Sequence, residues 1–72
     1  MGVPEFFEKS SGELEDITKH SSDWERRRNA LYELFVRGEV GRLKNLYKHQ
    51  SGEIGIRAGE YLKQLGYNLE KI

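Results

Sequence analysis

Apolar side chains recur every three or four positions through most of this chain, and this spacing constrains its fold more than any other feature. A helix brings such positions onto one face, whereas a half-buried strand requires strict alternation. The sequence contains neither runs of alternating β-branched residues nor Asn-Gly or Asp-Gly hairpin turns. The only proline, Pro4, stands where it suits the first turn of a short helix. The chain is therefore expected to be all-α.

Capping boxes predict where the first two main helices begin. Ser10 and Glu13 have the spacing in which the serine and the glutamate cap each other's backbone, and the helix that follows is expected to end near His20. Ser22 and Glu25 repeat this spacing and predict the start of a second helix. The predicted inner face of this second helix consists of Trp24, Arg28, Leu31, Leu34 and Phe35.

Glycines predict where helices end. Gly38 is placed to close the second helix, and Gly66 supplies the left-handed residue that commonly ends a helix. Between them we expect a third helix from about Glu39 to a break at residues 49–52, and a fourth helix capped by Ser51. The apolar faces of these helices consist of Val40, Leu43, Leu46 and Tyr47, and of Ile54, Ala58, Tyr61, Leu62 and Leu65.

The two halves of the chain resemble each other. The matching pairs are Leu14 and Leu43, Ile17 and Leu46, Lys19 and Lys48, His20 and His49, Ala30 and Ala58, Leu34 and Leu62, and Gly38 and Gly66. Residues 12–38 and 39–66 thus share the pattern helix, short loop, helix, glycine. The sequence predicts one domain of residues 1–72, a small bundle of four to five short helices arranged as two αα-hairpins, with a short N-terminal helix and a C-terminal tail.

The end of each half resembles a known repeat. Residues 57–66 read Arg57-Ala58-Gly59-Glu60-Tyr61-Leu62-Lys63-Gln64-Leu65-Gly66, which is similar to the HEAT-like repeat of the phycobilisome-lyase type, where an arginine precedes an alanine and a Leu-x-x-Leu-Gly ending closes the helix. Residues 28–38 match more loosely, because Arg37 stands where the second leucine belongs. The resemblance covers about residues 12–66 and implies one and a half to two units of an α-solenoid. Solenoids usually need three or more units, so a plain helical bundle is the alternative.

The composition limits the classes of protein to which this chain can belong. The twelve basic residues balance the twelve acidic ones, which removes the net positive charge typical of a nucleic-acid binder. Without cysteine, neither a disulfide nor a thiolate zinc site can reinforce the thin core of a 72-residue chain. The N-terminus lacks the basic start and apolar run of a signal peptide, and no stretch approaches membrane-spanning length. We therefore expect a cytoplasmic protein without a membrane partner.

The residues that could carry catalysis or bind metal have simpler structural interpretations. His20 and His49 each follow a lysine at a helix end, where a cation interacts favourably with the helix dipole. The serines occupy cap and loop positions, and no carboxylate stands inside an apolar stretch that would raise its pKa. The His-Glu pairs of iron-binding HEAT-like hydroxylases are missing, as are the glycine-rich loops that bind phosphate. We expect no enzyme activity, no cofactor and no metal site.

Gly55 and Gly59 lie four residues apart inside the predicted fourth helix, where each costs about 1 kcal/mol relative to alanine. Close packing against another helix of this chain, or against a second subunit, would compensate for this cost.

The leading functional hypothesis is a non-enzymatic protein-interaction module that binds a protein partner or another copy of itself. Apolar residues that fall off the main helix faces support it, since aromatic residues and arginine commonly anchor interfaces. The alternative is a small DNA- or RNA-binding protein that uses the basic residues of the middle helices in a helix-turn-helix manner. In the predicted fourth helix, however, the acidic Glu53 and Glu60 oppose the few basic side chains. The candidate interaction residues are Arg26, Arg27, Tyr32, Val36, Arg37, Arg42, Lys44, Tyr47, Lys48 and Ile56.

Overall fold

The computed structural model describes residues 4–72, and every regular element in this range is a helix. The four α-helices are α1 (Ser11–His20), α2 (Trp24–Val36), α3 (Val40–His49) and α4 (Gly52–Gln64). Two short 3-10 helices flank them, η1 (Pro4–Glu8) and η2 (Leu69–Lys71). The predicted all-α class is confirmed. Residues 1–3 of the predicted domain lie outside the described residues.

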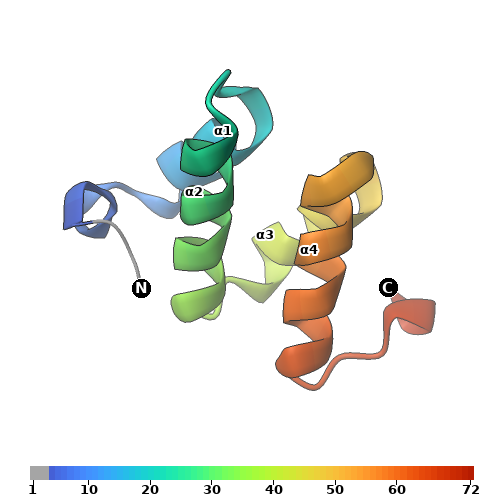
Figure 1. Ribbon diagram of the computed structural model, residues 1–72. Coiled ribbons are helices and arrows are strands. Elements are labelled where there is room, and N and C mark those ends of the chain that lie inside the picture. Colours follow the sequence, from blue (N-terminus) through green and yellow to red (C-terminus); the bar gives the residue numbers. More distant parts are fainter. Residues whose placement is uncertain (1–3) are drawn as a thin grey trace.

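The helices pack as two hairpins, α1 against α2 and α3 against α4, as the sequence predicted (Figure 1). Helix α2 also contacts α3 and α4, so the two hairpins meet along α2. Helices α2 and α4 run in the same direction, because Arg28 and Glu53 pair near both N-termini whereas Phe35 and Tyr61 stack further along.

A single cluster of buried side chains spans both hairpins. Its fully buried members are Phe6, Leu14, Ala30, Leu31, Leu34, Leu43, Leu46, Ile54, Ala58 and Leu62. Leu69 and Ile72 of the C-terminal tail pack against this cluster at its edge. Burial of a leucine or phenylalanine contributes about 1.5–3 kcal/mol, so this cluster is the main source of stability.

The matched ends of the two halves have the same backbone geometry. Gly38 and Gly66 adopt positive φ angles of 70° and 95°. The N–H of the residue after each glycine donates to the carbonyl of the matched leucine, Leu34 or Leu62, at 3.0 Å. This six-residue closure is the Schellman motif, which favours glycine at the left-handed position. Both predicted glycine stops are confirmed.

The start of α1 agrees with the prediction, whereas the starts of α2 and α4 differ from it in detail. The capping box at Ser10 is confirmed: Ser10 Oγ accepts from the N–H of Glu13 at 3.1 Å, and Glu13 Oε1 accepts from the N–H of Ser10 at 2.9 Å. The predicted box at Ser22 is wrong, because the neighbouring Asp23 caps α2 by accepting from the N–H of Glu25 at 2.9 Å. An aspartate carboxylate at this position also interacts favourably with the positive end of the helix dipole. At the start of α4, Ser51 holds the cap position without a side-chain hydrogen bond.

Several residues assigned to inner faces lie partly in solvent. Trp24 is 47% exposed and Leu65 is 37% exposed, because they stand at the start of α2 and the end of α4, beyond the edge of the core. Arg28 is half-exposed and pairs with Glu53 rather than pointing into the core. Periodicity indicates the side of a helix but not how far along the helix its neighbours reach.

Gly55 and Gly59 pack closely against other parts of this chain, which is the first of the two explanations expected from the sequence. A Cβ atom on Gly55 would overlap the carbonyl oxygen of Gln50. A Cβ on Gly59 would lie 2.9 Å from the ring of Tyr47 and 3.3 Å from Leu69 Cδ1. The two glycines therefore let α4 approach the end of α3 and the C-terminal tail.

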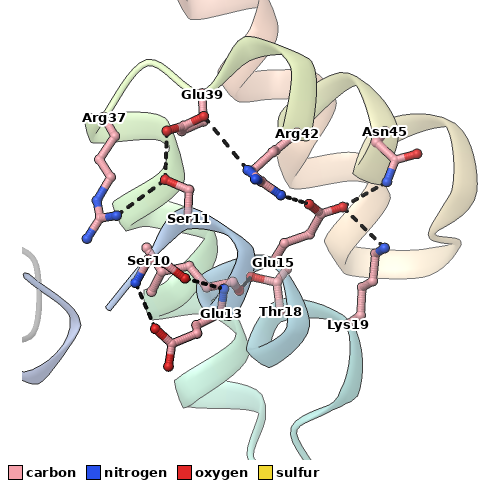
Figure 2. Close-up of polar contacts among 11 residues, drawn as sticks. Ser10, Ser11, Glu13, Glu15, Thr18, Lys19, Arg37, Glu39, Arg42 and Asn45 are labelled. Atoms are coloured by element: carbon pink, nitrogen blue, oxygen red, sulfur yellow. Dashed lines mark hydrogen bonds and ion pairs between the residues drawn. The ribbon is translucent and has the colours of Figure 1, made fainter. Parts of the chain in front are cut away.

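A buried carboxylate, Glu15, joins the two hairpins, a feature that the sequence pattern did not indicate. Figure 2 shows Glu15 of α1 accepting from Arg42 Nη1 at 2.6 Å and Asn45 Nδ2 at 2.8 Å, both on α3, and from Lys19 Nζ at 3.2 Å. Burial raises the pKa of Glu15, but the hydrogen bonds from Asn45, Arg42 and Lys19 together outweigh it and leave that pKa below its ordinary value. Glu15 is therefore an ionised link between α1 and α3.

Candidate functional site

The fold brings three aromatic rings together at the surface, where α2 and α4 lie side by side. The rings of Phe35 and Tyr61 stack with their centroids 4.4 Å apart and their planes 14° apart. The ring of Tyr32 contacts them at centroid distances of 6.1 and 6.4 Å. All three side chains are only half-buried, so the cluster has a face open to solvent. Aromatic pairs of this kind contribute about 0.5–1.5 kcal/mol beyond the area they bury, which fixes the shape of this face.

Two aliphatic side chains extend the aromatic face toward the C-terminal ends of the helices. Val36 lies one turn beyond Tyr32 and Leu65 one turn beyond Tyr61. They are 57% and 37% exposed. We call the set of Tyr32, Phe35, Val36, Tyr61 and Leu65 the α2–α4 seam. It is an apolar surface built from both hairpins.

A charged cluster bounds the seam at its N-terminal end. Glu53 Oε2 lies 2.6 Å from Arg57 Nε and 3.6 Å from Arg28 Nη1. The hydrogen bond from Arg57 is the main cause of the lowered pKa of Glu53. The Glu53 carboxylate thus pairs with the guanidinium groups of both Arg57 and Arg28. Burial raises the pKa of Tyr61, so its hydroxyl stays protonated at neutral pH.

The first two predicted basic residues form bonds with η1 and within the N-terminal hairpin. Arg26 Nη1 lies 2.7 Å from Glu5 Oε1. Arg27 Nε donates to the carbonyl of Thr18 at 2.8 Å, and its guanidinium lies 4.2 Å from the centroid of the Trp24 ring. Both arginines hold the start of α2 against the segments that precede it.

Arg37 and Arg42 also form bonds within the chain. Arg37 Nη2 donates to the carbonyl of Phe6 at 2.8 Å, while its Nε pairs with the buried Glu33 at 3.2 Å. Arg42 is the main cationic partner of Glu15 (Figure 2). These guanidinium groups tie η1 and α1 to the rest of the fold.

The predicted residues of α3 lie near the C-terminal tail. Lys44 Nζ lies 5.0 Å from the centroid of the Tyr67 ring, a cation–π contact that fastens the tail. Tyr47 packs over Gly59. Lys48 is exposed near the end of α3.

Of the ten predicted residues, Tyr32 and Val36 are the two that the structure places in the α2–α4 seam. Ile56 is 64% exposed on α4 but lies about 140° around the helix from Tyr61, so it faces away from the seam. The ten residues therefore contact several different parts of the chain.

The sequence pattern did not single out the other members of this surface. Phe35 and Tyr61 match the inner-face spacing, and their half-exposure depends on where α2 meets α4, which local spacing does not encode. One signal was available in the sequence. Arg28 precedes Tyr32 by four residues and Arg57 precedes Tyr61 by four, which puts an arginine one turn before a tyrosine on each helix.

Other kinds of site were sought in the described residues. Residues 4–72 contain no pocket and no group of three or more histidine, aspartate or glutamate side chains arranged to hold a metal ion. None of the helices in this range is both long and apolar enough to pass through a bilayer. Comparison of the chain with protein-family models, with curated proteins and with solved structures finds no match.

Proposed function

We propose that this chain is a non-enzymatic protein-interaction module whose contact surface is the α2–α4 seam. The observation that carries the proposal is the solvent-facing aromatic cluster of Tyr32, Phe35 and Tyr61, which exists only because the two hairpins pack together. Interface centres are enriched in tyrosine, phenylalanine and arginine; the seam supplies the first two, and Arg28 and Arg57 lie at its border.

The rigidity of the seam supports the same role. Its side chains come from two α-helices rather than loops, and stacking holds the rings of Phe35 and Tyr61 in place. A surface that is already ordered loses little side-chain freedom on binding, which favours affinity.

The bonds of the basic residues favour protein interaction over nucleic-acid binding. Arg26, Arg37 and Arg42 pair with carboxylates of this chain, so a phosphate would have to compete with these partners. Titration with random duplex and single-stranded nucleic acid at low salt tests the alternative. Binding that weakens steeply as salt rises would favour it over the protein-interaction role.

The proposed function is tested by site-specific photo-crosslinking in the cells that produce the protein. A photoreactive amino acid is placed at Val36, in the seam, or at Lys48, which is exposed on α3 outside the seam. We expect a crosslinked protein adduct from position 36 and none from position 48. The replacement Tyr32→Ser should remove the adduct at position 36. Equal adducts from both positions, or none from position 36, would contradict the proposal.

A further inference from the structure

The border of the α2–α4 seam on α4 carries charges of alternating sign. Glu53 and Arg57 pair with each other, and Glu60 follows on the next turn. Glu60 is exposed and lies near enough to Arg57 and Tyr61 for its charge to act on both. Within residues 4–72 it forms no ion pair. The Glu60 carboxylate therefore lies beside the seam and is available to pair with a cationic side chain of a partner.

A mixed border of this kind discriminates among partners. A polyanion would meet Glu53 and Glu60, and a strongly basic surface would meet Arg28 and Arg57, so either would bring like charges together. Juxtaposed like charges oppose association. A partner with its own mixture of both signs avoids this repulsion, and a second copy of the seam carries that mixture.

The direction of the helices allows such a self-complementary contact. Because α2 and α4 run in the same direction, a two-fold axis that crosses them sets each helix antiparallel to its copy. In a two-fold contact, residue i of one copy meets residue j of the other, and j meets i. Along α4, the two-fold axis can pass midway between Arg57 and Glu60. The arginine of each copy then lies opposite the glutamate of the other copy.

The same axis brings the apolar part of the seam together. Tyr61 directly follows Glu60, and one residue advances a helix by about 1.5 Å, so the Tyr61 ring lies close to this axis. Tyr32 contacts Tyr61 from α2 and is therefore close to the axis too. The two tyrosines of each copy would meet those of the other at the centre, with the charged pairs at the side.

We propose that the partner at the α2–α4 seam is a second copy of this chain, bound as an antiparallel two-fold dimer in which Arg57 of each copy pairs with Glu60 of the other. This inference rests on the proposed function, because it uses the same contact surface.

The dimer is tested with two charge-reversal variants, Arg57→Glu and Glu60→Arg. Both side chains are exposed on α4, and circular dichroism checks that each variant is folded. Sedimentation equilibrium of the wild type, of each variant alone and of their equimolar mixture is measured from micromolar to millimolar concentration. Each variant alone places two pairs of like charges across the contact, whereas the mixture places opposite charges at both pairs.

We expect a concentration-dependent dimer for the wild type and a dissociation constant raised by at least about tenfold for each variant alone. The mixture should form a mixed dimer with an affinity near that of the wild type. A wild type that stays monomeric at millimolar concentration would overturn the proposal. So would a single variant that dimerises as well as the wild type, or a mixture that remains monomeric.

The crosslinking experiment distinguishes a failure of the dimer proposal from a failure of the proposed function. An adduct at position 36 with a mass other than twice that of the chain, together with a monomeric wild type, would overturn the dimer and leave the interaction surface supported. No adduct and no dimer would overturn both.

Discussion

At Gly55 the backbone of α4 lies against the end of α3, and a single methyl group there has no space. The Cβ of an alanine would overlap the carbonyl oxygen of Gln50, a backbone atom that cannot rotate aside as the end of a side chain can. We expect Gly55→Ala to lower the free energy of unfolding by about 1–3 kcal/mol, the usual cost of overpacking, despite the better helix propensity of alanine.

The matched control is Gly41→Ala in α3, where nothing lies within 4 Å of the new Cβ. This replacement should raise the free energy of unfolding, by up to about 1 kcal/mol. Urea denaturation of both variants measures the two effects. Equal stabilisation by both would show that α4 does not need a glycine at position 55.

Glu15 gives the fold a dependence on pH whose sign follows from its lowered pKa. Because the pKa of Glu15 in the folded chain lies below the ordinary value of 4.5, its ionised form stabilises the fold. This contribution is complete above pH 4.5 and is lost as the pH falls through the folded value. We expect Glu15→Gln to lower the free energy of unfolding at pH 7 by about 1–3 kcal/mol, since Arg42 and Lys19 lose a charged acceptor.

Urea denaturation of the wild type and Glu15→Gln at a series of pH values measures the difference between them. It should stay constant from pH 7 down to the ordinary value of 4.5 and then shrink as Glu15 takes up a proton. A difference that persists unchanged in acid would mean that the charge of Glu15 is not what joins α1 to α3.

At the scale of the elements, the start of α2 depends on Asp23 rather than on Ser22. The Asp23 carboxylate accepts from the N–H groups of Glu25 and Arg26 at 2.9 and 3.4 Å. We expect Asp23→Ala to cost about 1 kcal/mol of stability, whereas Ser22→Ala should change it by less than about 0.5 kcal/mol. Thermal unfolding followed by circular dichroism measures both. A larger effect at Ser22 would restore the capping box that the sequence pattern predicts.

Helix boundaries were predictable from the sequence wherever local chemistry decides them. Gly38, Gly66 and the Ser10 capping box act through atoms within a few residues, so their spacing in the sequence is enough. The start of α2 was mistaken because two adjacent residues can each cap a helix, and the spacing of Glu25 favoured the wrong one. The spacing places Trp24 on the same face as Leu31 and Leu34, but it is exposed because periodicity ignores the finite length of the neighbouring helices.

The candidate surface was less predictable, because it depends on contacts between distant elements. Phe35 and Tyr61 are 26 positions apart in the sequence, and their stacking follows from α2 and α4 lying side by side. Tyr32 and Val36 were identified because they fall off the main face of α2. The buried Glu15 was missed for a related reason, since Arg42 and Asn45, which hold it ionised, lie on α3.

At the scale of the whole molecule, the two hairpins share one core, so we expect them to unfold together. Trp24, the only tryptophan, reports on the first hairpin, while Ile54 is fully buried in the second. The cluster that contains Ile54 also contains Leu31 and Leu34 of α2. Loss of a methyl group at Ile54 should therefore also lower the urea concentration at which the hairpin of Trp24 unfolds, although the two residues belong to different hairpins.

The replacement Ile54→Val tests this coupling, with Ile56→Val as its control because Ile56 is largely exposed on the same helix. We expect Ile54→Val to lower the free energy of unfolding by about 0.5–1.5 kcal/mol and Ile56→Val to leave it nearly unchanged. In urea, the midpoint reported by Trp24 fluorescence should fall as far as that reported by circular dichroism, since a cooperative chain has one transition. If Ile54→Val lowers only the circular dichroism midpoint, the hairpins unfold separately, and the α2–α4 seam is lost when the less stable hairpin unfolds.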